Sequence, residues 1–379
     1  MSSAQQLMHK AKNEILYNAL NFDSIVLAVF RFHLRELALQ RSVTTEVMSV
    51  DKTVDRLIDL GRLIDGNIVA GRFQIGKHIY SGIYPLKFQV NDNEQSGKYA
   101  MKVDLPHQRR NRLYKEAFIL KRLSDCPHVS KYVEYGSYSG IDYLVLTMVG
   151  PDLTTIRKRA MDRNFDLGTV LRIGIQCAEA LSAVHEAGFV LRDVRPENFA
   201  IGLHQDKDVI SIVDFGAALQ IRFDVNNFTI RPEMNASFCG SRLHASFNAH
   251  YGLELSPHDD IISLFYMMAD LYLGKLPWTN VEDFKKIGEL KRTCKADVIF
   301  GDMPDCIKNM YRALKRFTYG ELFNHSEIIE QLTQAADILN APKSLRLDEP
   351  DVTCLKNVSM HTASLRSAKK NVPRRSKSV

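Results

Sequence analysis

One stretch of the chain carries two acidic residues at a spacing suited to metal-assisted chemistry on a hydroxyl group. Asp193 lies in the run RDVRPEN, Asn198 follows it by five residues, and Asp214 follows it by 21 residues in the run VDFG. A carboxylate can orient a hydroxyl or accept its proton, and carboxylate and amide oxygens are hard ligands that suit Mg²⁺. A D-F-G run alone can end any buried strand, but the two runs at this distance predict a phosphoryl-transfer site.

The composition is that of a soluble globular protein. Of the 379 residues, 45% are hydrophobic and 25% are charged, which is enough for one large two-lobed domain or two ordinary ones. None of the six cysteines forms a C-x-x-C pair, so the sequence has no zinc or thioredoxin-like signature. Cysteines scattered along a chain of this size indicate a reducing compartment. The apolar run 25–30 is too short to span a bilayer and lies too far in for a secretory signal. We expect a protein of the cytoplasm, the nucleus or both, with no transmembrane segment.

The positive charge of the chain is concentrated at its end. The net charge is +6, and residues 360–379 hold six Lys and Arg side chains and no acids. The rest of the chain is therefore near neutral, which argues against a specific nucleic-acid-binding function. We expect residues 342–379, where Pro, Ser, Lys and Arg accumulate, to be a disordered tail. Its KKNVPRRSK run could be a nuclear-import signal, a patch for phosphate or lipid, or a solubilising tail.

Strand-like patterns give way to helical ones after Gly150-Pro151. Short apolar runs bounded by Gly, Asn and Ser predict an antiparallel meander, and apolar residues three or four apart predict helices. The expected strands cover 73–79, 83–90, 98–103, 129–138 and 143–149, with a helix over 109–123. Later helices are expected over 153–161, 169–187, 259–273, 281–294, 305–317 and 325–339. Residues 1–68 show two helical apolar stripes, which could pack on the main domain or bind a partner or membrane surface.

The chain from about 69 to 340 resembles the casein kinase 1 family, and is most similar to its tau-tubulin kinase branch. The resemblance rests on GFVLRDVRPENFAIG, VDFGAAL, CGSRLHASFNAHYG, HDDIISLFYMMADLYLGKLPW and FTYGELFNHSEIIEQL. In place of the A-P-E run of other protein kinases, this family has an A-S-x-N-x-H run, here Ala245–His250. The implied fold is α+β and two-lobed, with a small antiparallel-sheet lobe carrying one main helix and a larger helical lobe. The implied division is 1–68 as an N-terminal helical extension, 69–341 as the kinase domain and 342–379 as the tail.

The resemblance implies a monomeric serine/threonine protein kinase that transfers the γ-phosphate of ATP to hydroxyl groups of protein substrates, with Mg²⁺ as its metal. Asp193 would orient the substrate hydroxyl, and Arg195 stands where the family has a lysine that touches the γ-phosphate. Asn198 and Asp214 would hold the metal. Asp260 would brace the catalytic loop from behind.

The resemblance also assigns a nucleotide site. Lys102 matches the strand lysine that bridges the α- and β-phosphates, and Glu116 matches the acid that holds it in place. Leu146 takes the gatekeeper position, and Met148 would supply backbone hydrogen bonds to adenine. Of the three glycines that let a loop approach the phosphates, only Gly82 remains.

Several positions depart from the family pattern and leave a second interpretation open. Tyr80 and Pro85 replace two of the loop glycines, and Pro85 has no N–H to donate. Lys87 replaces the valine above adenine, Leu191 replaces the histidine of H-R-D, and Arg195 is not a like-for-like substitute for lysine. The alternative is a pseudokinase or weak kinase that acts as a protein-binding scaffold.

Overall fold

The computed structural model describes residues 66–79, 86–95, 97–104, 111–138, 140–159, 164–221, 236–319, 321, 324–345 and 347. The predictions for the N-terminal extension to residue 65, for Gly82 and its neighbours, and for the basic run of the tail lie outside these residues. The chain divides into two compact units, one made of Met1–Ala117 with Tyr132–Met148, the other of Phe118–Lys131 with Val149–Val379.

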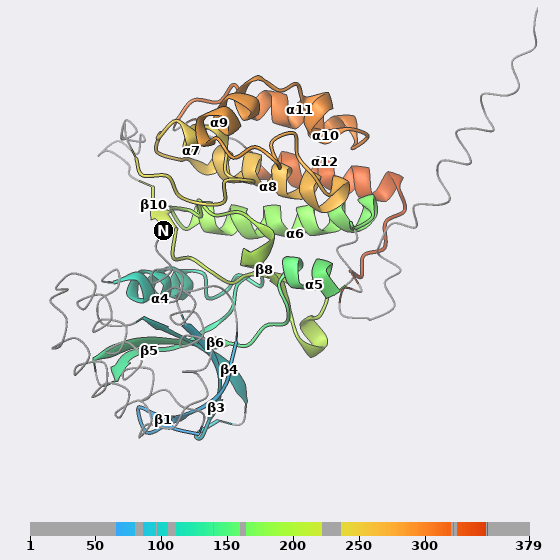
Figure 1. Cartoon of the computed structure of the whole chain (residues 1–379). Helices are drawn as coiled ribbons and strands as arrows, with labels where there is room; N and C mark the ends of the chain where they lie inside the picture. Colours follow the sequence, from blue (N-terminus) through green and yellow to red (C-terminus); the bar gives the residue numbers. More distant parts are fainter. Residues whose placement is uncertain are drawn as a thin grey trace, which may run out of the picture. The chain divides into compact units, whose positions relative to one another are not determined.

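The first unit is built on a six-stranded antiparallel sheet whose strand order is β1-β2-β3-β4-β6-β5 (Figure 1). The alternation of buried and less buried side chains along β2 and β3 is the period-two pattern of a sheet with one covered face. The strands are β1 (Ile68–Val69), β2 (Phe73–His78), β3 (Leu86–Asp92), β4 (Lys98–Asp104), β5 (Tyr132–Tyr138) and β6 (Ile141–Thr147).

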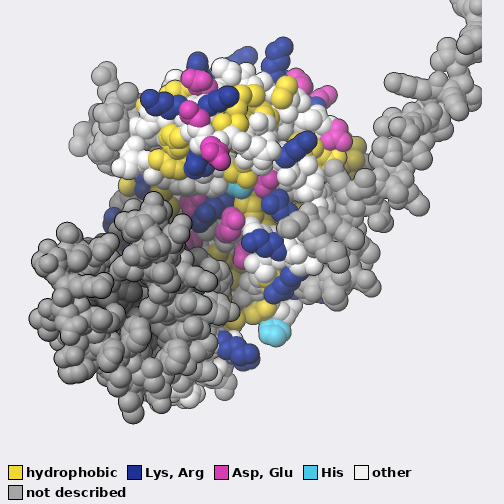
Figure 2. All heavy atoms as spheres, in the orientation of Figure 1, with side chains coloured by type: hydrophobic (Ala, Val, Ile, Leu, Met, Phe, Trp, Pro, Cys, Tyr) yellow, Lys and Arg dark blue, Asp and Glu magenta, His cyan; other side chains and the backbone are white. Residues whose placement is uncertain are grey.

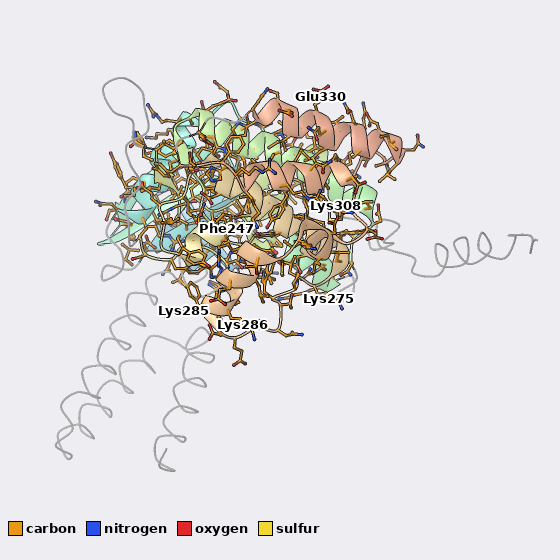
Figure 3. The ribbon with its side chains drawn as sticks, turned by 90° about the horizontal axis from the view of Figure 1, so that it is seen from above. Phe247, Lys275, Lys285, Lys286, Lys308 and Glu330 are labelled. Atoms are coloured by element: carbon orange, nitrogen blue, oxygen red, sulfur yellow. The ribbon has the colours of Figure 1, made fainter. Side chains whose placement is uncertain are left out.

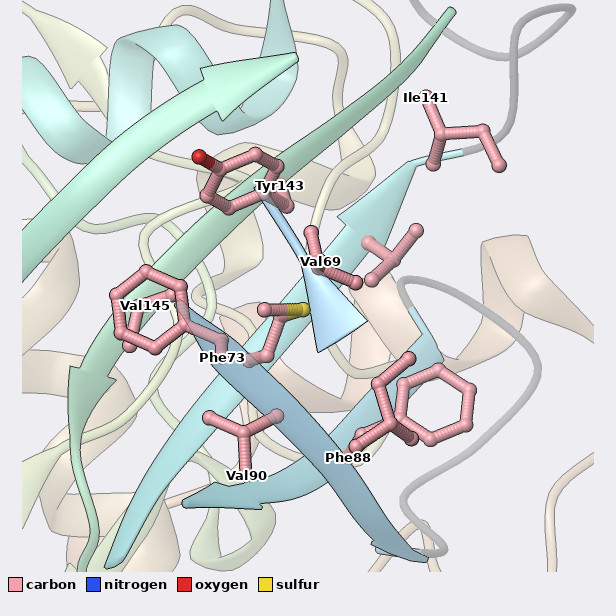
Figure 4. Close-up of a cluster of buried hydrophobic side chains, with 10 residues drawn as sticks. Val69, Phe73, Phe88, Val90, Ile141, Tyr143 and Val145 are labelled. Carbon is pink, nitrogen blue, oxygen red and sulfur yellow. The ribbon is translucent and has the colours of Figure 1, made fainter. Parts of the chain in front are cut away.

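One face of this sheet carries the apolar core of the first unit (Figure 4). Its members come from all strands but β5, so each strand contributes alternate side chains to a single cluster. Phe73 and Tyr143 meet edge to face with ring centroids 6.4 Å apart, a geometry that aromatic pairs prefer. The buried members are Val69, Phe73, Ile75, Phe88, Val90, Met101, Val103, Ile141, Tyr143 and Val145.

The second unit is mainly helical, with two short two-stranded sheets formed by β7 with β10 and by β8 with β9 (Figure 1). Helix α4 (Arg112–Arg122) runs from the first unit into the second. The longer helices of the second unit are α5 (Leu153–Arg159), α6 (Leu167–Glu186), α8 (Pro257–Leu273), α9 (Phe284–Thr293), α11 (Asp305–Leu314) and α12 (His325–Ile338). The short elements are β7 (Phe189–Val190), η2 (Pro196–Asn198), β8 (Phe199–Ile201), η3 (His204–Asp206), β9 (Ile210–Ile212), β10 (Leu219–Gln220), α7 (Phe247–His250) and α10 (Ala296–Phe300).

Helix α6 packs against both α8 and α12 and forms the centre of the second unit. Helix α8 is buried on nearly every side, as expected for a helix that is apolar all round. It begins at Pro257, two residues before the predicted start, because Ser256 and Asp259 form a capping box and proline fits the first helical turn. It ends at Gly274, whose φ of 79° is the left-handed conformation that glycine adopts without strain.

The predicted α+β fold, with an antiparallel sheet in one part and helices in the other, is confirmed. The predicted strands and helices agree with the observed ones to within three residues at each described end. The two short two-stranded sheets, β1, α7 and α10 were not predicted, because elements of two to five residues are too short to show a hydrophobic period. Helix α6 alone among the described helices is long and apolar enough to cross a membrane, and most of it is buried in the protein.

The described surface of the second unit mixes charges of both signs. Figure 2 shows Lys and Arg side chains interspersed with Asp and Glu side chains on the face in view. Lys285 and Lys286 project from the start of α9 into solvent (Figure 3). This mixture agrees with the near-neutral charge that the sequence predicts for the chain before its tail.

The chain after α12 remains attached to the second unit. Asp208 Oδ1 accepts hydrogen bonds from Ser344 Oγ at 2.9 Å and from the Leu345 backbone N–H at 2.8 Å. Leu345 and Leu347 are buried, and Arg172 Nη2 on α6 donates to the Ala341 carbonyl at 2.9 Å. Residues 341–345 and Leu347 therefore form a strap on the helical unit, beyond the end predicted for the domain at 341.

Two substitutions in α12 test whether its packing on the second unit stabilises the fold. Leu332 is fully buried, so Leu332→Ala should lower the free energy of unfolding by about 2–5 kcal/mol through lost burial and a cavity. Ile338, on the same helix, is 79% exposed, and Ile338→Ala should change it by less than about 0.5 kcal/mol. Urea unfolding followed by circular dichroism measures both, and equal effects would contradict the packing described.

Candidate active site

The loop that carries Asp193 is held from behind by a buried carboxylate. Asp260, in the first turns of α8, is 1% exposed. Its Oδ2 accepts the Leu191 backbone N–H at 2.7 Å, and its Oδ1 accepts the Arg192 backbone N–H at 2.8 Å. Arg192 has a φ of 65°, a strained value for a residue with a side chain. The contact expected of Asp260 is therefore present, and it fixes the backbone on which Asp193 is mounted.

Asn198 fixes the side chain of Asp193. The Asn198 amide Nδ2 donates to the Asp193 carbonyl at 2.8 Å and to Asp193 Oδ2 at 2.9 Å. Asp193 Oδ1 is buried and has no hydrogen-bond partner in the described part of the chain. A buried acceptor without a partner costs free energy, so this oxygen is suited to accept a hydrogen bond from a bound hydroxyl group.

The β8–β9 hairpin brings Asp214 to this site. The chain leaves Asn198 along β8 and returns along β9, which pairs with β8 in antiparallel register. The Val213 N–H then donates to the Asn198 carbonyl at 3.0 Å, one residue before Asp214. Asp214 Oδ1 accepts the Gly216 N–H at 2.7 Å. The 20 residues between the two acids in the sequence thus contain a hairpin that returns the second acid beside the first.

Burial and neighbouring charges set the acidity of Asp193. Burial raises the pKa of its carboxyl above the ordinary value, and the negative charge of Asp214 raises it further. Arg195 and the Asn198 hydrogen bond act in the opposite direction. Arg195 Nε lies 3.2 Å from Asp193 Oδ2 as an ion pair, without forming a hydrogen bond. The carboxyl is therefore a stronger base than an exposed aspartate.

The first unit contains the residues that the sequence predicts to bind the nucleotide. Lys102 Nζ on β4 donates to Glu116 Oε1 on α4 at 2.5 Å, and both side chains are almost fully buried. Breaking a buried ion pair of this kind is costly, so the position of the lysine ammonium is well defined. Leu146 is buried on β6, and Met148 follows the end of that strand. Gly82 lies outside the described residues.

The residues present in the second unit fit the divalent metal that the sequence predicts. No group of three or more His, Cys, Asp or Glu side chains that could enclose a metal occurs in the described ranges. A pair of side-chain ligands suits Mg²⁺, which is often held by one or two carboxylates together with substrate phosphates and water. Asn198 uses its amide N–H₂ on Asp193, which points its carbonyl oxygen elsewhere and keeps it available as a ligand.

The Ala245–His250 run joins the start of α8 to α9. Asn248 Nδ2 donates to Asp259 Oδ1 at 2.9 Å. The buried Lys291 ammonium donates to the carbonyls of Arg242 and Ala245 at 2.8 and 2.6 Å. Burial lowers the pKa of Lys291, and the faces of Tyr266 and Trp278 lie within 5.5 Å of its charge.

Gly240, Lys291 and His185 support this site, and the sequence did not single them out. Gly240 packs against the Arg192 carbonyl, where an added Cβ would lie 2.6 Å from the oxygen. A glycine before a motif is a visible signal, but its reason, a φ of 98° at a point of close approach, appears only in the structure. Lys291 and His185 lie in helices, and their partners are far away in the sequence.

Comparison with known proteins identifies a domain that covers most of the described chain. Residues 73–335 match the model of the protein kinase domain. The chain is 31% identical over 262 residues to a probable serine/threonine-protein kinase of Dictyostelium discoideum. The matched residues make up 69% of this chain and 52% of the relative. It is 30% identical over 212 residues to the serine/threonine-protein kinase spe-6 of Caenorhabditis elegans, and the match covers 54% of this chain and 56% of that relative. The chain thus matches about half the length of these curated relatives.

Two glycines test the close contact behind the catalytic loop. Gly188 and Gly240 both have positive φ, so an alanine at either position should cost roughly 1–2 kcal/mol of backbone strain. Only at Gly240 would the new Cβ also meet a backbone oxygen. We expect Gly240→Ala to destabilise the protein clearly more than Gly188→Ala in urea unfolding. Similar losses for both variants would argue against the contact with Arg192.

Proposed function

Because the chain belongs to the protein kinase domain family, we propose that it transfers the γ-phosphate of ATP to serine or threonine hydroxyl groups of proteins. The observation that carries the proposal is Asp193, a partly buried carboxylate that is fixed by Asn198 and has one buried oxygen left for a hydroxyl. The names of the two relatives, both serine/threonine-protein kinases, support the choice of acceptor.

The chain's own residues supply positioning and charge. Asp260 holds the backbone at Leu191 and Arg192, and Asn198 holds the Asp193 carboxylate. Asp193 can then hold the acceptor hydroxyl in one orientation and take its proton as the oxygen attacks. Positioning of this kind accounts for a large share of catalysis in phosphoryl transfer.

Asn198 and Asp214 would hold a divalent metal, which we propose to be Mg²⁺ because their oxygens are hard ligands. When bound, such a metal supplies positive charge that neutralises the phosphate oxygens. Lys102, held by Glu116, would contact the phosphates of ATP. Leu146 and Met148 would border the adenine, and Arg195, whose charge is placed beside Asp193, would face the transferred group.

We further propose that the chain is a casein kinase 1-like enzyme close to the tau-tubulin kinases. The Ala245–His250 run supports this assignment because it matches the A-S-x-N-x-H run of that family. Its residues also make defined contacts: Asn248 donates to Asp259, and the Ala245 carbonyl accepts a hydrogen bond from Lys291. We also propose that it acts as a monomer in the cytoplasm, the nucleus or both, on protein substrates and without specific binding to nucleic acid.

Removal of the Asp193 carboxylate tests the proposed activity. Asp193→Asn keeps the size of the side chain but removes the base, so incorporation of labelled phosphate into casein or tubulin tails should fall about 100-fold or more. Asp206→Asn, an exposed acid in the same unit, is the matched control and should keep full activity. Equal incorporation by the wild type and Asp193→Asn would exclude the kinase proposal and favour a scaffold without catalysis.

The pH dependence of the reaction tests the charge of Arg195. Asp193 must be ionised to act as a base, so activity falls as the pH drops through its pKa. Arg195 lowers the pKa of Asp193. Arg195→Gln should therefore move the acid limb of the kcat/KM profile to higher pH, whereas Arg195→Lys should leave it near the wild-type position. An acid limb that stays in place in Arg195→Gln would show that this ion pair does not set the pKa.

A further inference from the structure

Two histidines of the helical unit that are 140 residues apart in the sequence are in direct contact. His185 is the penultimate residue of α6, and His325 is the first residue of α12. His185 Nδ1 and His325 Nε2 lie 2.7 Å apart, a hydrogen-bond distance. The rings are tilted by 44° with centroids 5.0 Å apart, so the contact is made through the nitrogen atoms rather than by flat stacking.

His185 continues this contact to the catalytic loop. Its Nε2 lies 2.9 Å from Asp260 Oδ2, the same oxygen that accepts the Leu191 backbone N–H. An ionised carboxylate can only accept hydrogen bonds, so His185 Nε2–H is the donor in this hydrogen bond. A continuous series of hydrogen bonds therefore runs from α12 through His185 and Asp260 to Leu191 and Arg192.

His325 is suited to hold the ring of His185. Burial and, to a smaller extent, the neighbouring His185 lower the pKa of His325 to about 4, so His325 is neutral at neutral pH. Because His185 Nε2 carries the proton that faces Asp260, His185 Nδ1 is the acceptor, and His325 Nε2 donates the hydrogen bond between the two rings. The described residues give His185 Nδ1 no other hydrogen-bond partner, so His325 and Asp260 together fix the orientation of this buried ring.

We propose that His325 is a positioning residue that acts through His185 and Asp260 to hold the catalytic-loop backbone. Without it, the His185 Nδ1 acceptor would be buried and unsatisfied, which favours rotation of the ring. A rotated ring would no longer donate to Asp260, and the carboxylate would be free to move away from the strained Arg192 backbone. The effect on phosphotransfer rests on the proposed function, but the restraint of the loop does not.

Hydrogen exchange of the intact protein tests the restraint without requiring activity. His325→Phe keeps a ring and removes the hydrogen bond, and His325→Gln keeps a polar nitrogen and oxygen at a similar reach. We expect the Leu191 and Arg192 amides to exchange about tenfold faster in His325→Phe, because local opening becomes easier. They should keep near wild-type rates in His325→Gln. Amides in the middle of α12, such as Leu332, should be unaffected in both.

Kinetic constants give a second readout that loss of folded protein would not produce. In His325→Phe, kcat per folded protein should fall about tenfold, while KM for ATP should change less than about twofold, because the loop is displaced but the nucleotide contacts are kept. His325→Gln should recover most of kcat. Glu327→Gln, an exposed residue in the first turn of the same helix, is the control and should behave as the wild type.

The outcomes separate the proposal from its alternatives. Unchanged exchange at Leu191 and Arg192 in His325→Phe would overturn it, whether or not the protein proves to be a kinase. Equal acceleration at Leu332 would also overturn it, because it would show only a loosened helix. If the wild-type protein shows no kinase activity but His325→Phe still speeds exchange in the loop alone, the restraint would be supported and the proposed function rejected. If His325→Phe does not fold, His325→Asn replaces it, since its amide is too short to reach His185, and the same loss against His325→Gln is expected.

Discussion

The site depends on one carboxylate that accepts two consecutive backbone N–H groups. Asp260 binds the amides of Leu191 and Arg192, and Arg192 sits in a left-handed conformation that costs of order 1–3 kcal/mol unless its surroundings enforce it. Asp260 lies near the N-terminus of α8, where the helix dipole favours negative charge. The strain of the loop is therefore balanced by a rigid, buried helix rather than by the loop itself.

The other candidate site residues of the second unit are linked to the backbone that Asp260 holds by short contacts. The Arg192 guanidinium donates to the Ala217 carbonyl at 2.7 Å, just after the V-D-F-G run. Asn198 links the Asp193 side chain to its own backbone, and the β8–β9 hairpin returns Asp214 to the same place. Loops carry the reactive groups, and the helices behind them supply the rigidity that a positioning mechanism requires.

The sequence was sufficient to predict the fold and that Asp193, Asn198 and Asp214 lie together, but not the residues behind them. Asp193, Asn198 and Asp214 were predicted to act together because their spacing is a motif, and the structure brings them together. Helices α6, α8 and α12 were predicted because their apolar residues recur at helical spacing. His185 and His325 form no motif: they are 140 residues apart, and each is an unremarkable residue of its own helix. Contacts of this kind arise from how helices pack, which local patterns do not encode.

The strap after α12 has a consequence for whatever the end of the chain binds. Asp208 holds Ser344 and Leu345, and Leu347 is buried, so the residues that follow in the sequence are joined to the helical unit at a fixed point near β9 and α6. A ligand captured by the basic residues that follow would be tethered to that point, and its encounter with the kinase domain would become intramolecular. Its effective concentration near this face would then depend on the length of the tether rather than on its concentration in solution.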